Sequence, residues 1–433
     1  MSKCIIIDMG DNLKTHPERL IEKAEYEIKK ILYPEKLTKE ELDRLRLFSK
    51  YKYKKPFKSL LENQIATLKR FDRHKQLTDN CNVKTRACYL KYLKIFCQFT
   101  NKSLENITKE DILNFFSSLS NRSPKTRDNY KITIKNFYQL LNGMEGQNYP
   151  EIVSWLKLER NNHYKLPEEL LTEEDIKKLV NVANNIRDKA LIAVCYESAC
   201  RVSELLGIRL KHVNFDEYGA ILIVNGKTGM RRIRLINSVP ILKTWLNEHP
   251  FKDDPEAPLW VDISKRTFGK PLFRDGFYAR LKVLAKKAGL KKNVFPHLFR
   301  HSKMTEYAKD FTESELKVIA GWTRTSQMPA VYVSLSGGDI DKKILQKNGL
   351  LEKDKQKESL LKPKVCIRCN ENNSFDLRFC KKCSYPLDAK ALSDLEKIRE
   401  IVNEFIATKL MQKPEFMKEL PQMVEEWNKE KVK

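Results

Sequence analysis

The sequence predicts a multidomain protein that is mainly α-helical, with one α+β unit and a small cysteine-rich module near the C-terminus. Apolar residues recur at helical intervals between residues 58 and 145, and two short β-type runs flank a glycine-containing turn between residues 220 and 236. Four cysteines form two close pairs after residue 365. The chain has 433 residues, of which 41% are apolar. At about 150 residues per domain, this is enough for three units that each have a core.

The N-terminal part of the chain is expected to be helical. Residues 1–57 are predicted to form a helical extension, because Glu, Lys and Leu occur there at helical spacing and Pro34 divides the segment. Residues 58–145 are predicted to form a bundle of four helices, because four stretches repeat apolar residues every three or four positions. Thr108 with Asp111 fits a capping box at the start of the third of these helices.

A linker is expected at residues 146–167, followed by an α+β unit at residues 168–345. Thr172 and Asp175 fit another capping box at its first helix. The runs 220–224 and 231–236 flank the sequence Asn-Gly-Lys-Thr-Gly and predict an antiparallel β hairpin. Apolar spacing predicts helices at residues 173–184, 187–199, 238–247, 274–288, 298–309 and 312–320, with a short one ending near residue 206.

After a second linker at residues 346–364, the paired cysteines predict a zinc ribbon at residues 365–388. Two Cys-x-x-Cys pairs separated by ten residues can direct four thiolates at one structural Zn²⁺ ion. Redox chemistry is the alternative, but redox Cys-x-x-Cys motifs normally occur singly in a βαβ context. The proposed ligands are Cys366, Cys369, Cys380 and Cys383.

Residues 389–433 are predicted to form a helical tail. Apolar residues at helical spacing between residues 391 and 412 predict an amphipathic helix of near-neutral charge. Its apolar stripe is expected either to pack within the chain or to dock onto a partner.

The charge distribution indicates a polyanionic partner. The chain carries 82 Lys and Arg against 57 Asp and Glu, a formal net charge of +25. Residues 51–150 alone contain 19 basic and 8 acidic side chains. Such a concentration favours salt-dependent binding to nucleic acid over a set of merely solvated helix faces. The basic residues that follow the Tyr-Lys-Tyr-Lys-Lys run are Lys84, Arg86, Lys91, Lys94, Arg122, Lys125, Arg127, Lys131 and Lys135.

No segment indicates a membrane protein. The longest apolar runs, such as residues 190–194, are far shorter than the ~20 residues that cross a bilayer, and the N-terminus lacks the apolar core of a secretory signal. We therefore expect a soluble, cytoplasmic protein that has no membrane partner.

Several polar motifs occur in one order along the α+β unit. Ala199-Cys200-Arg201-Val202-Ser203-Glu204-Leu205-Leu206-Gly207 is followed by Gly226-Lys227-Thr228-Gly229, His297-Leu298-Phe299-Arg300-His301, Gly321-Trp322 and finally Tyr332. In this order they resemble the tyrosine recombinases, or phage-type integrases, over about residues 60–350. The resemblance implies a SAM-like core-binding domain at residues 58–145 and a tyrosine recombinase catalytic domain at residues 168–345. The cysteine module resembles that of archaeal or archaeal-virus members.

The resemblance also implies a site that cleaves and rejoins DNA strands through a 3′-phosphotyrosyl intermediate. Tyr332 corresponds to the nucleophile, and Arg201 and Arg300 suit the paired clamping of phosphate oxygens. By resemblance, Lys227 is the general acid and His297 the proton-transfer partner. Trp322 stands where most members carry His, while Glu204 and His301 are expected to support the site. Catalysis would need neither a nucleotide nor a divalent metal.

The implied partner is double-stranded DNA, bound by a homo-oligomer that is a monomer or dimer when free and a tetramer on paired sites. A nucleoid-associated location follows from that partner. Two other functions stay open. One is a type IB topoisomerase-like nicking and rejoining enzyme. The other is a sequence-specific DNA-binding protein with impaired catalysis, which the Trp322 departure and the long interval from Trp322 to Tyr332 would fit.

Overall fold

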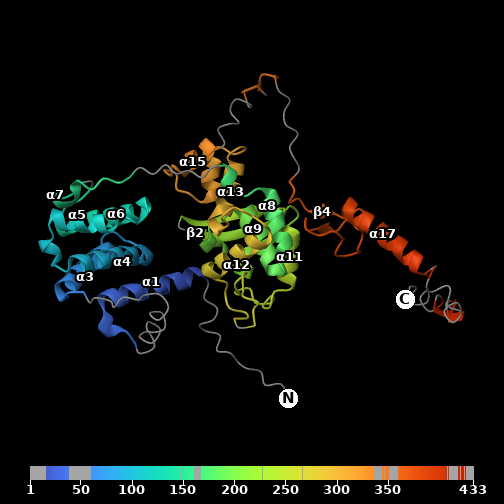
Figure 1. Ribbon diagram of the computed structural model, residues 1–433, viewed down its shortest axis with the longest axis horizontal. Helices are drawn as coiled ribbons and strands as arrows, with labels where there is room; N and C mark the ends of the chain where they lie inside the picture. Colours follow the sequence, from blue (N-terminus) through green and yellow to red (C-terminus); the bar gives the residue numbers. More distant parts are fainter. Residues whose placement is uncertain are drawn as a thin grey trace, which may run out of the picture. The chain divides into compact units, whose positions relative to one another are not determined.

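The computed structural model contains two compact units, which lie within Met1–Lys165 and Leu166–Lys433 and are described separately (Figure 1). The structure describes residues 16–38, 60–146, 148–159, 167–226, 228–265, 267–335, 344–345, 347–350 and 359–406, with isolated positions beyond residue 406.

The first unit contains the predicted four-helix bundle. Its helices are α3 (Glu62–Leu77), α4 (Val83–Thr100), α5 (Lys109–Ser118) and α6 (Pro124–Leu141). The capping box of Thr108 and Asp111 is confirmed at α5, where the two residues exchange side-chain and backbone hydrogen bonds. Buried aromatic rings in edge-on contact, such as Phe96 with Phe115, fill the space between the helices.

The bundle also includes two segments outside the predicted boundaries. Helix α1 (His16–Leu32) packs against α4 and α3, and its Ala24, Ile28 and Ile31 lie in the same core, because their four- and three-residue spacing places them on one face. The short helix α7 (Glu151–Ser154) packs on α6 and buries Val153. Parts of the expected extension and of the expected linker are therefore structural components of the bundle. Short 3₁₀ turns occur at Pro34–Lys36 and Leu104–Asn106.

The second unit is built around one buried helix. Helix α9 (Ile186–Ser198) contacts α8 (Glu173–Val182), α11 (Val239–Asn247) and α13 (Pro296–Tyr307), and all of its residues 190–196 are buried, as expected for a helix segment that is apolar on every side. The Thr172 and Asp175 capping box is confirmed at α8. The remaining helices are α10 (Val202–Leu205), α12 (Arg274–Lys287), α14 (Glu313–Ala320) and α15 (Met328–Leu335), with 3₁₀ turns at Pro167–Glu169 and Leu210–His212.

A three-stranded antiparallel sheet covers part of this core. The predicted hairpin is confirmed as β2 (Gly219–Gly226) and β3 (Gly229–Leu235), and Gly226 faces Gly229 at the turn. A third strand, β1 (Val213–Asp216), pairs with β2 and was not predicted, because only its first residue is even partly buried and four residues give no periodic signal. The order is β1-β2-β3.

The cysteine module is joined to this second unit. Its strands β4 (Lys364–Val365) and β5 (Asn372–Asn373) pair antiparallel, and β5 contacts α11. Leu361 and Phe375 are buried in the same core as α9. Lys189 on α9 forms an ion pair with Asp376 at 2.7 Å, so apolar and charged contacts together hold the module on the helices.

Helix α17 (Ala389–Phe405) follows the module. Its apolar stripe is exposed in the described structure, with Ile398 56% and Ile401 65% exposed. Of the two expected outcomes, packing within the chain is therefore not seen among the described residues. None of the described helices combines the length and apolar character that a membrane crossing requires.

Candidate functional sites

Tyr332 lies in a closed pocket of the second unit. Helix α15 carries it against α13 and α14, and the side chain is 1% exposed. Its hydroxyl lies 3.0 Å from Nδ1 of His301, and the Trp322 ring stacks on its ring with centroids 5.5 Å apart. Because the hydroxyl is covered, a phosphate can reach it only when part of this cover moves.

Arg300 lies on α13 in the same pocket. Its Nη1 donates to the Ala199 carbonyl at 2.8 Å and its Nη2 to the Ala320 carbonyl at 2.7 Å, while the guanidinium carbon lies 5.4 Å from the centre of the Trp322 ring. Burial, followed by the neighbouring Arg201 charge, lowers the pKa of Arg300 to about 10. The group is therefore still cationic at neutral pH.

Arg201 is the N-cap residue of α10 and the more accessible of the two arginines, with 29% of its side chain exposed. Its Nη1 pairs with Oε1 of Glu204 at 2.7 Å, and its Nη2 donates to the Gly321 carbonyl at 3.2 Å. Burial raises the pKa of Glu204, but hydrogen bonds and charge from Arg231 and Arg201 outweigh burial and lower it below its ordinary value. A fixed carboxylate thus orients Arg201.

The electrostatics of Tyr332 keep its phenol protonated at neutral pH. Burial raises its pKa, and the charges of Arg300 and Arg201 offset this only in part, so that the pKa stays above its ordinary value. Arg300 and Tyr332 both contact the Trp322 ring, and Arg201 donates to the carbonyl of Gly321, the residue before Trp322. A proton acceptor is therefore needed before this oxygen can attack phosphorus.

The two histidines of α13 lie side by side, and one of them contacts the phenol. Their ring centroids are 4.5 Å apart, and His301, which was expected to support the site from farther away, is the one at hydrogen-bond distance from Tyr332. His297 was expected near the nucleophile; its side chain is exposed and its ring lies edge-on against that of His301. The sequence placed both on one helix start, but which ring meets the phenol depends on how α15 packs on α13.

Lys227 lies outside the described residues. Its neighbours show where the hairpin turn is attached: the Thr228 hydroxyl donates to the Gly321 carbonyl at 3.0 Å, the same oxygen that accepts from Arg201. Gly321 ends α14 with a φ of +61°, in the left-handed region that favours glycine. The hairpin and the arginine site therefore meet at one helix terminus.

Arg231 on β3 belongs to this site and was not singled out from the sequence. Its Nη2 pairs with Oε2 of Glu204 at 2.7 Å, and its Nε donates to the Ile319 carbonyl at 3.2 Å. Local sequence gave no signal, because Arg231 is one of three arginines in the segment 231–234. Only strand alternation, which places residues 231, 233 and 235 on one face, separates it from Arg232 and Arg234.

The basic residues of the first unit divide into two groups. Arg86 forms a two-point ion pair with Asp72 at 2.6 and 2.9 Å, and Arg127 pairs with Glu159 at 2.9 Å, so these side chains are engaged within the unit. Another group is exposed and forms no ion pair within the described part of the chain. Its members are Lys84, Lys91, Arg122 and Lys125. This second group supplies a cationic surface available to an external polyanion.

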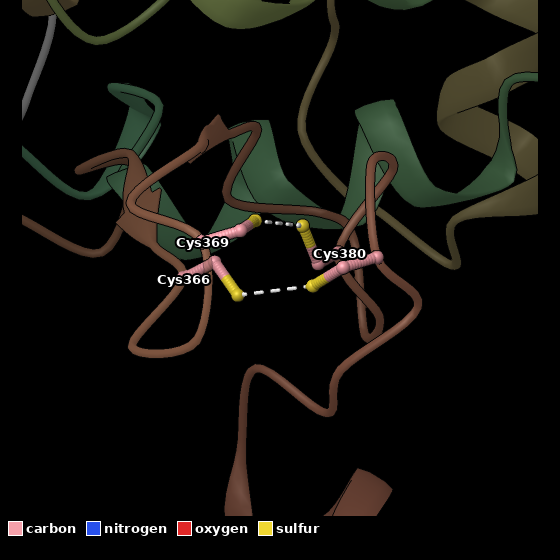
Figure 2. A group of neighbouring side chains, drawn as sticks. Cys366, Cys369 and Cys380 are labelled. Atoms are coloured by element: carbon pink, nitrogen blue, oxygen red, sulfur yellow. Dashed lines mark hydrogen bonds between the residues drawn. The ribbon is translucent and has the colours of Figure 1, made fainter.

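The four cysteines of the module converge at one point. Figure 2 shows their sulfur atoms facing one another from two loops. The Sγ atoms of Cys366 and Cys383 are 3.5 Å apart, those of Cys369 and Cys380 are 3.6 Å apart, and all four lie within 4.8 Å of one another. Zn–S bonds of about 2.3 Å in a tetrahedron separate sulfur atoms by about 3.8 Å. The donor set therefore fits a closed tetrathiolate site.

Two matching loops and one amide shape this cysteine cluster. Asn370 and Ser384 each follow the first cysteine of a pair by four residues, adopt a φ of 56°, and donate a backbone hydrogen bond to that cysteine's carbonyl. The buried Asn373 donates to Sγ of Cys380 at 3.6 Å and accepts from the backbone of Lys381 at 2.9 Å. Such outer contacts hold the sulfur atoms of the cluster in fixed positions.

The sequence matches models of one family in both units. The model described as "Phage integrase family" matches residues 169–337, and the model described as "Phage integrase, N-terminal SAM-like domain" matches residues 67–145. The two matches lie in the second and first structural units, respectively, and together span more than half of the chain.

Curated relatives and solved structures agree with this match. Tyrosine recombinase XerA of Pyrococcus horikoshii is 35% identical over 150 residues, which are 33% of this chain and 50% of that protein. A tyrosine recombinase of Thermosipho africanus is 28% identical over 237 residues, which are 51% of this chain and 78% of that protein.

A likeness in fold extends to a solved DNA complex. The structure of the Tn1549 transposon integrase in complex with transposon right end DNA covers 65% of this chain and 99% of that chain, with a TM-score of 0.50 and 17% identity, which shows similarity of fold alone. With both family domains matched in order along one sequence, the chain belongs to the phage integrase family of tyrosine recombinases.

Proposed function

We propose that this protein is a site-specific DNA recombinase that cleaves and rejoins DNA strands through a 3′-phosphotyrosyl intermediate. The observation that carries the proposal is the juxtaposition of Tyr332 with two buried or half-buried arginines. Arg300 and Tyr332 are both 1% exposed and both contact the Trp322 ring, and Arg201 donates to the Gly321 carbonyl beside that residue. Paired guanidinium groups beside a nucleophilic oxygen suit a phosphodiester that gains negative charge during transfer.

The reaction follows from these groups. The Tyr332 oxygen forms a bond to phosphorus, its proton passes to the histidine pair, and the bond from phosphorus to the 5′-oxygen breaks. The leaving 5′-oxygen takes a proton from the proposed general acid, Lys227. We assign His297 as the proton-transfer partner and His301 as the residue that orients the phenol. Attack by a 5′-hydroxyl of another strand on the phosphotyrosine reverses these steps, so the bond energy is conserved without a nucleotide.

Trp322 is assigned to the cover of the site. Its ring stacks on Tyr332 and contacts the Arg300 guanidinium, so it holds both groups together and excludes water. An indole N–H can donate a hydrogen bond, as a histidine would in most members of the family.

The proposed partner is double-stranded DNA. The exposed basic group of the first unit, with a chain charge of +25, supports binding to the phosphate backbone. We propose that residues 58–145 form the core-binding domain and residues 168–345 the catalytic domain, flanked by the extension at 1–57, the linkers at 146–167 and 346–364, the ribbon at 365–388 and the tail at 389–433. A cytoplasmic, nucleoid-associated location agrees with this partner.

We propose a homo-oligomer, monomeric or dimeric when free and tetrameric on paired sites. The exposed apolar stripe of α17 supports association, because contiguous apolar side chains at the surface are costly unless another surface covers them.

We propose that the cysteine quartet holds one structural Zn²⁺ ion. Four thiolates leave no coordination position for a substrate, so the ion would stabilise the fold and take no part in strand transfer. The sulfur spacing and the Asn373 contact support this assignment.

A suicide-substrate assay tests the proposed function. The full-length protein is mixed with a nicked duplex that contains a sequence selected by the protein from a random pool, and covalent adducts are separated by denaturing electrophoresis. We expect an adduct that Tyr332→Phe abolishes. Failure of the wild-type protein to form one would favour a DNA-binding protein without catalysis. A supercoiled plasmid with two copies of the selected sequence separates the other two functions: relaxed circles without recombinant joints would favour the topoisomerase-like activity.

A further inference from the structure

Arg231 lies where three parts of the catalytic unit meet. It stands on β3, pairs through Nη2 with Oε2 of Glu204 on α10 at 2.7 Å, and donates through Nε to the Ile319 carbonyl of α14 at 3.2 Å. The other carboxylate oxygen of Glu204 holds Nη1 of Arg201 at 2.7 Å. One carboxylate therefore joins two arginines, of which only Arg201 is substantially accessible from outside, at 29% against 10% for Arg231.

The surrounding backbone is shaped to admit this side chain. A Cβ atom at Gly321 would lie 2.8 Å from Nη1 of Arg231, and a Cβ at Gly226 would lie closer still to Oε1 of Glu204. Each distance is shorter than a van der Waals contact. Two positions that lack a side chain thus border the Arg231 and Glu204 pair, at the base of the hairpin turn and at the end of α14.

Stability alone is a weak reason for this arrangement. Burying an ion pair costs desolvation that the attraction between the partners often fails to recover, and apolar side chains of similar size commonly stabilise a core as well or better. The Nη1 of Arg231 is also buried with no hydrogen-bond partner within the described residues. A buried guanidinium with an unpaired nitrogen is better explained by the orientation that it imposes on its neighbours.

We propose that Arg231 is a positioning residue for strand transfer, which fixes the Glu204 carboxylate so that Arg201 is held toward the scissile phosphate. It also anchors the β2–β3 hairpin, whose turn carries Lys227, to the end of α14 that bears Gly321 and Trp322. Arg231 itself does not touch the substrate in this proposal. The inference rests on the proposed function, because the phosphate is the group toward which Arg201 is aimed.

The chain offers a matched control on the same strand. Arg234 pairs with Asp216 on β1 at 2.6 Å, and both side chains are more than 30% exposed. Arg234→Gln removes one positive charge and one carboxylate partner from β3, as Arg231→Gln does, but away from the catalytic pocket. A difference between the two variants therefore reports position rather than charge.

The experiment uses the full-length protein and the nicked selected duplex at saturating concentration. We expect Arg231→Gln to slow covalent adduct formation on the order of 10²-fold, the cost of a misaligned catalytic group, while the DNA dissociation constant changes less than about threefold. Arg231→Lys should form the adduct about tenfold faster than Arg231→Gln, because an ammonium group keeps the charge but not the planar set of donors of a guanidinium. Arg234→Gln should stay within about twofold of the wild-type rate.

A double variant tests whether Arg231 acts through Glu204. If it does, Glu204→Gln with Arg231→Gln should be no slower than Glu204→Gln alone, because the second change removes a contact that is already lost. If the rate losses of the two single variants multiply in the double variant, the two residues act independently. That result would overturn the proposal that Arg231 acts through Glu204.

The pH dependence of the rate of adduct formation provides a further test. A residue that only stabilises the fold would leave this dependence unchanged. Charged and titratable groups that act on Glu204 are Arg201, Arg231, Arg300 and Cys200. Without Arg231, burial of Glu204 is less well offset and the pKa of its carboxyl rises. The acidic limb of the rate profile should therefore move to higher pH in Arg231→Gln and stay in place in Arg234→Gln.

Thermal melting shows which variants can be interpreted. If Arg231→Gln does not fold, the Arg231→Lys variant provides the test. A folded lysine variant with a wild-type rate and pH profile overturns the inference. A tenfold lower rate of adduct formation supports it. Adduct formation by Arg231→Gln at the wild-type rate overturns the inference and leaves the proposed function standing. Absence of any adduct with the wild-type protein overturns both.

Discussion

The hydroxyl oxygen of Tyr332 lies 3.0 Å from Nδ1 of His301. This contact joins α15 to α13 inside a pocket that also contains Arg300 and the ring of Trp322. In the described arrangement the phenol is therefore both covered and hydrogen-bonded.

Replacing Tyr332 by phenylalanine should abolish covalent adduct formation and leave DNA affinity nearly unchanged. The free energy of unfolding should fall by about 1 kcal/mol, because one buried hydrogen bond to His301 is lost while the ring remains. Gel separation of adducts, fluorescence anisotropy with the selected duplex and urea denaturation measure the three quantities.

Tyr307→Phe is the matched control for this variant. The Tyr307 hydroxyl donates to the Glu197 carbonyl at 3.2 Å, so its loss should cost a similar free energy of unfolding without affecting adduct formation. A persistent adduct in Tyr332→Phe would assign the nucleophile to another residue.

Strand cleavage should become faster as the pH rises above neutral. Since burial holds the pKa of Tyr332 above its ordinary value of 10.0, the reactive phenolate fraction grows with pH throughout the neutral and mildly alkaline range. A duplex whose 5′-bridging oxygen is replaced by sulfur isolates this effect, because a thiolate leaves without a proton. A rate on this duplex that stays level between pH 7 and pH 9 would show that phenol deprotonation does not limit cleavage.

DNA affinity should fall steeply with salt, and part of that dependence should come from the exposed basic group of the first unit. Replacing its four members by glutamine should lower the slope of log K against log salt by up to about 4, since each phosphate contact contributes about 0.9. The variant combines Lys84→Gln, Lys91→Gln, Arg122→Gln and Lys125→Gln. Anisotropy titrations at several salt concentrations measure the slope.

Arg86→Gln provides the contrast to this prediction. Because Arg86 is bound to Asp72 and only 12% exposed, its loss should lower the free energy of unfolding by about 3 kcal/mol and leave the salt slope unchanged. An unchanged slope in the fourfold variant would place the DNA on another surface.

Removing the metal should destabilise the whole catalytic unit, beyond the cysteine module itself. Leu361 and Phe375 are buried against α9, so unfolding of the module exposes apolar surface of the catalytic core. We expect one zinc ion per chain by elemental analysis, and a lower melting temperature of the catalytic unit after chelation or in Cys383→Ser.

Cys81→Ser, which alters a half-buried cysteine outside the cluster, should retain both the zinc and the melting temperature. Unchanged hydrogen-exchange protection of α9 after zinc removal would contradict the expected coupling between the module and the catalytic core.

The elements that could be predicted were those whose signal is local. The helices of the bundle and α8, α9 and α11 follow from apolar spacing and caps, and the hairpin follows from its turn. Helix α15 had no such signal, because its eight residues are mostly apolar and are fixed by packing on α13 and α14. The assignment of α1 to the bundle likewise depends on contacts with α4 that spacing alone does not specify.

The same distinction holds for the site. Arg201, Arg300 and Tyr332 stand in recognisable local motifs, whereas Arg231 meets Glu204 across 27 residues and Ile319 across 88 residues. The position of His301 at the phenol also depends on a contact across 31 residues. Partnerships of this kind are made by tertiary packing, which a motif does not encode.

The attachment of the cysteine module to α9 bears on how the enzyme can be shortened. A chain that stops at residue 345 would keep every proposed catalytic side chain, yet it would uncover the apolar patch on which Leu361 and Phe375 rest and leave Lys189 without Asp376. Such a truncated form is expected to aggregate during purification. A minimal active fragment should therefore extend through residue 388.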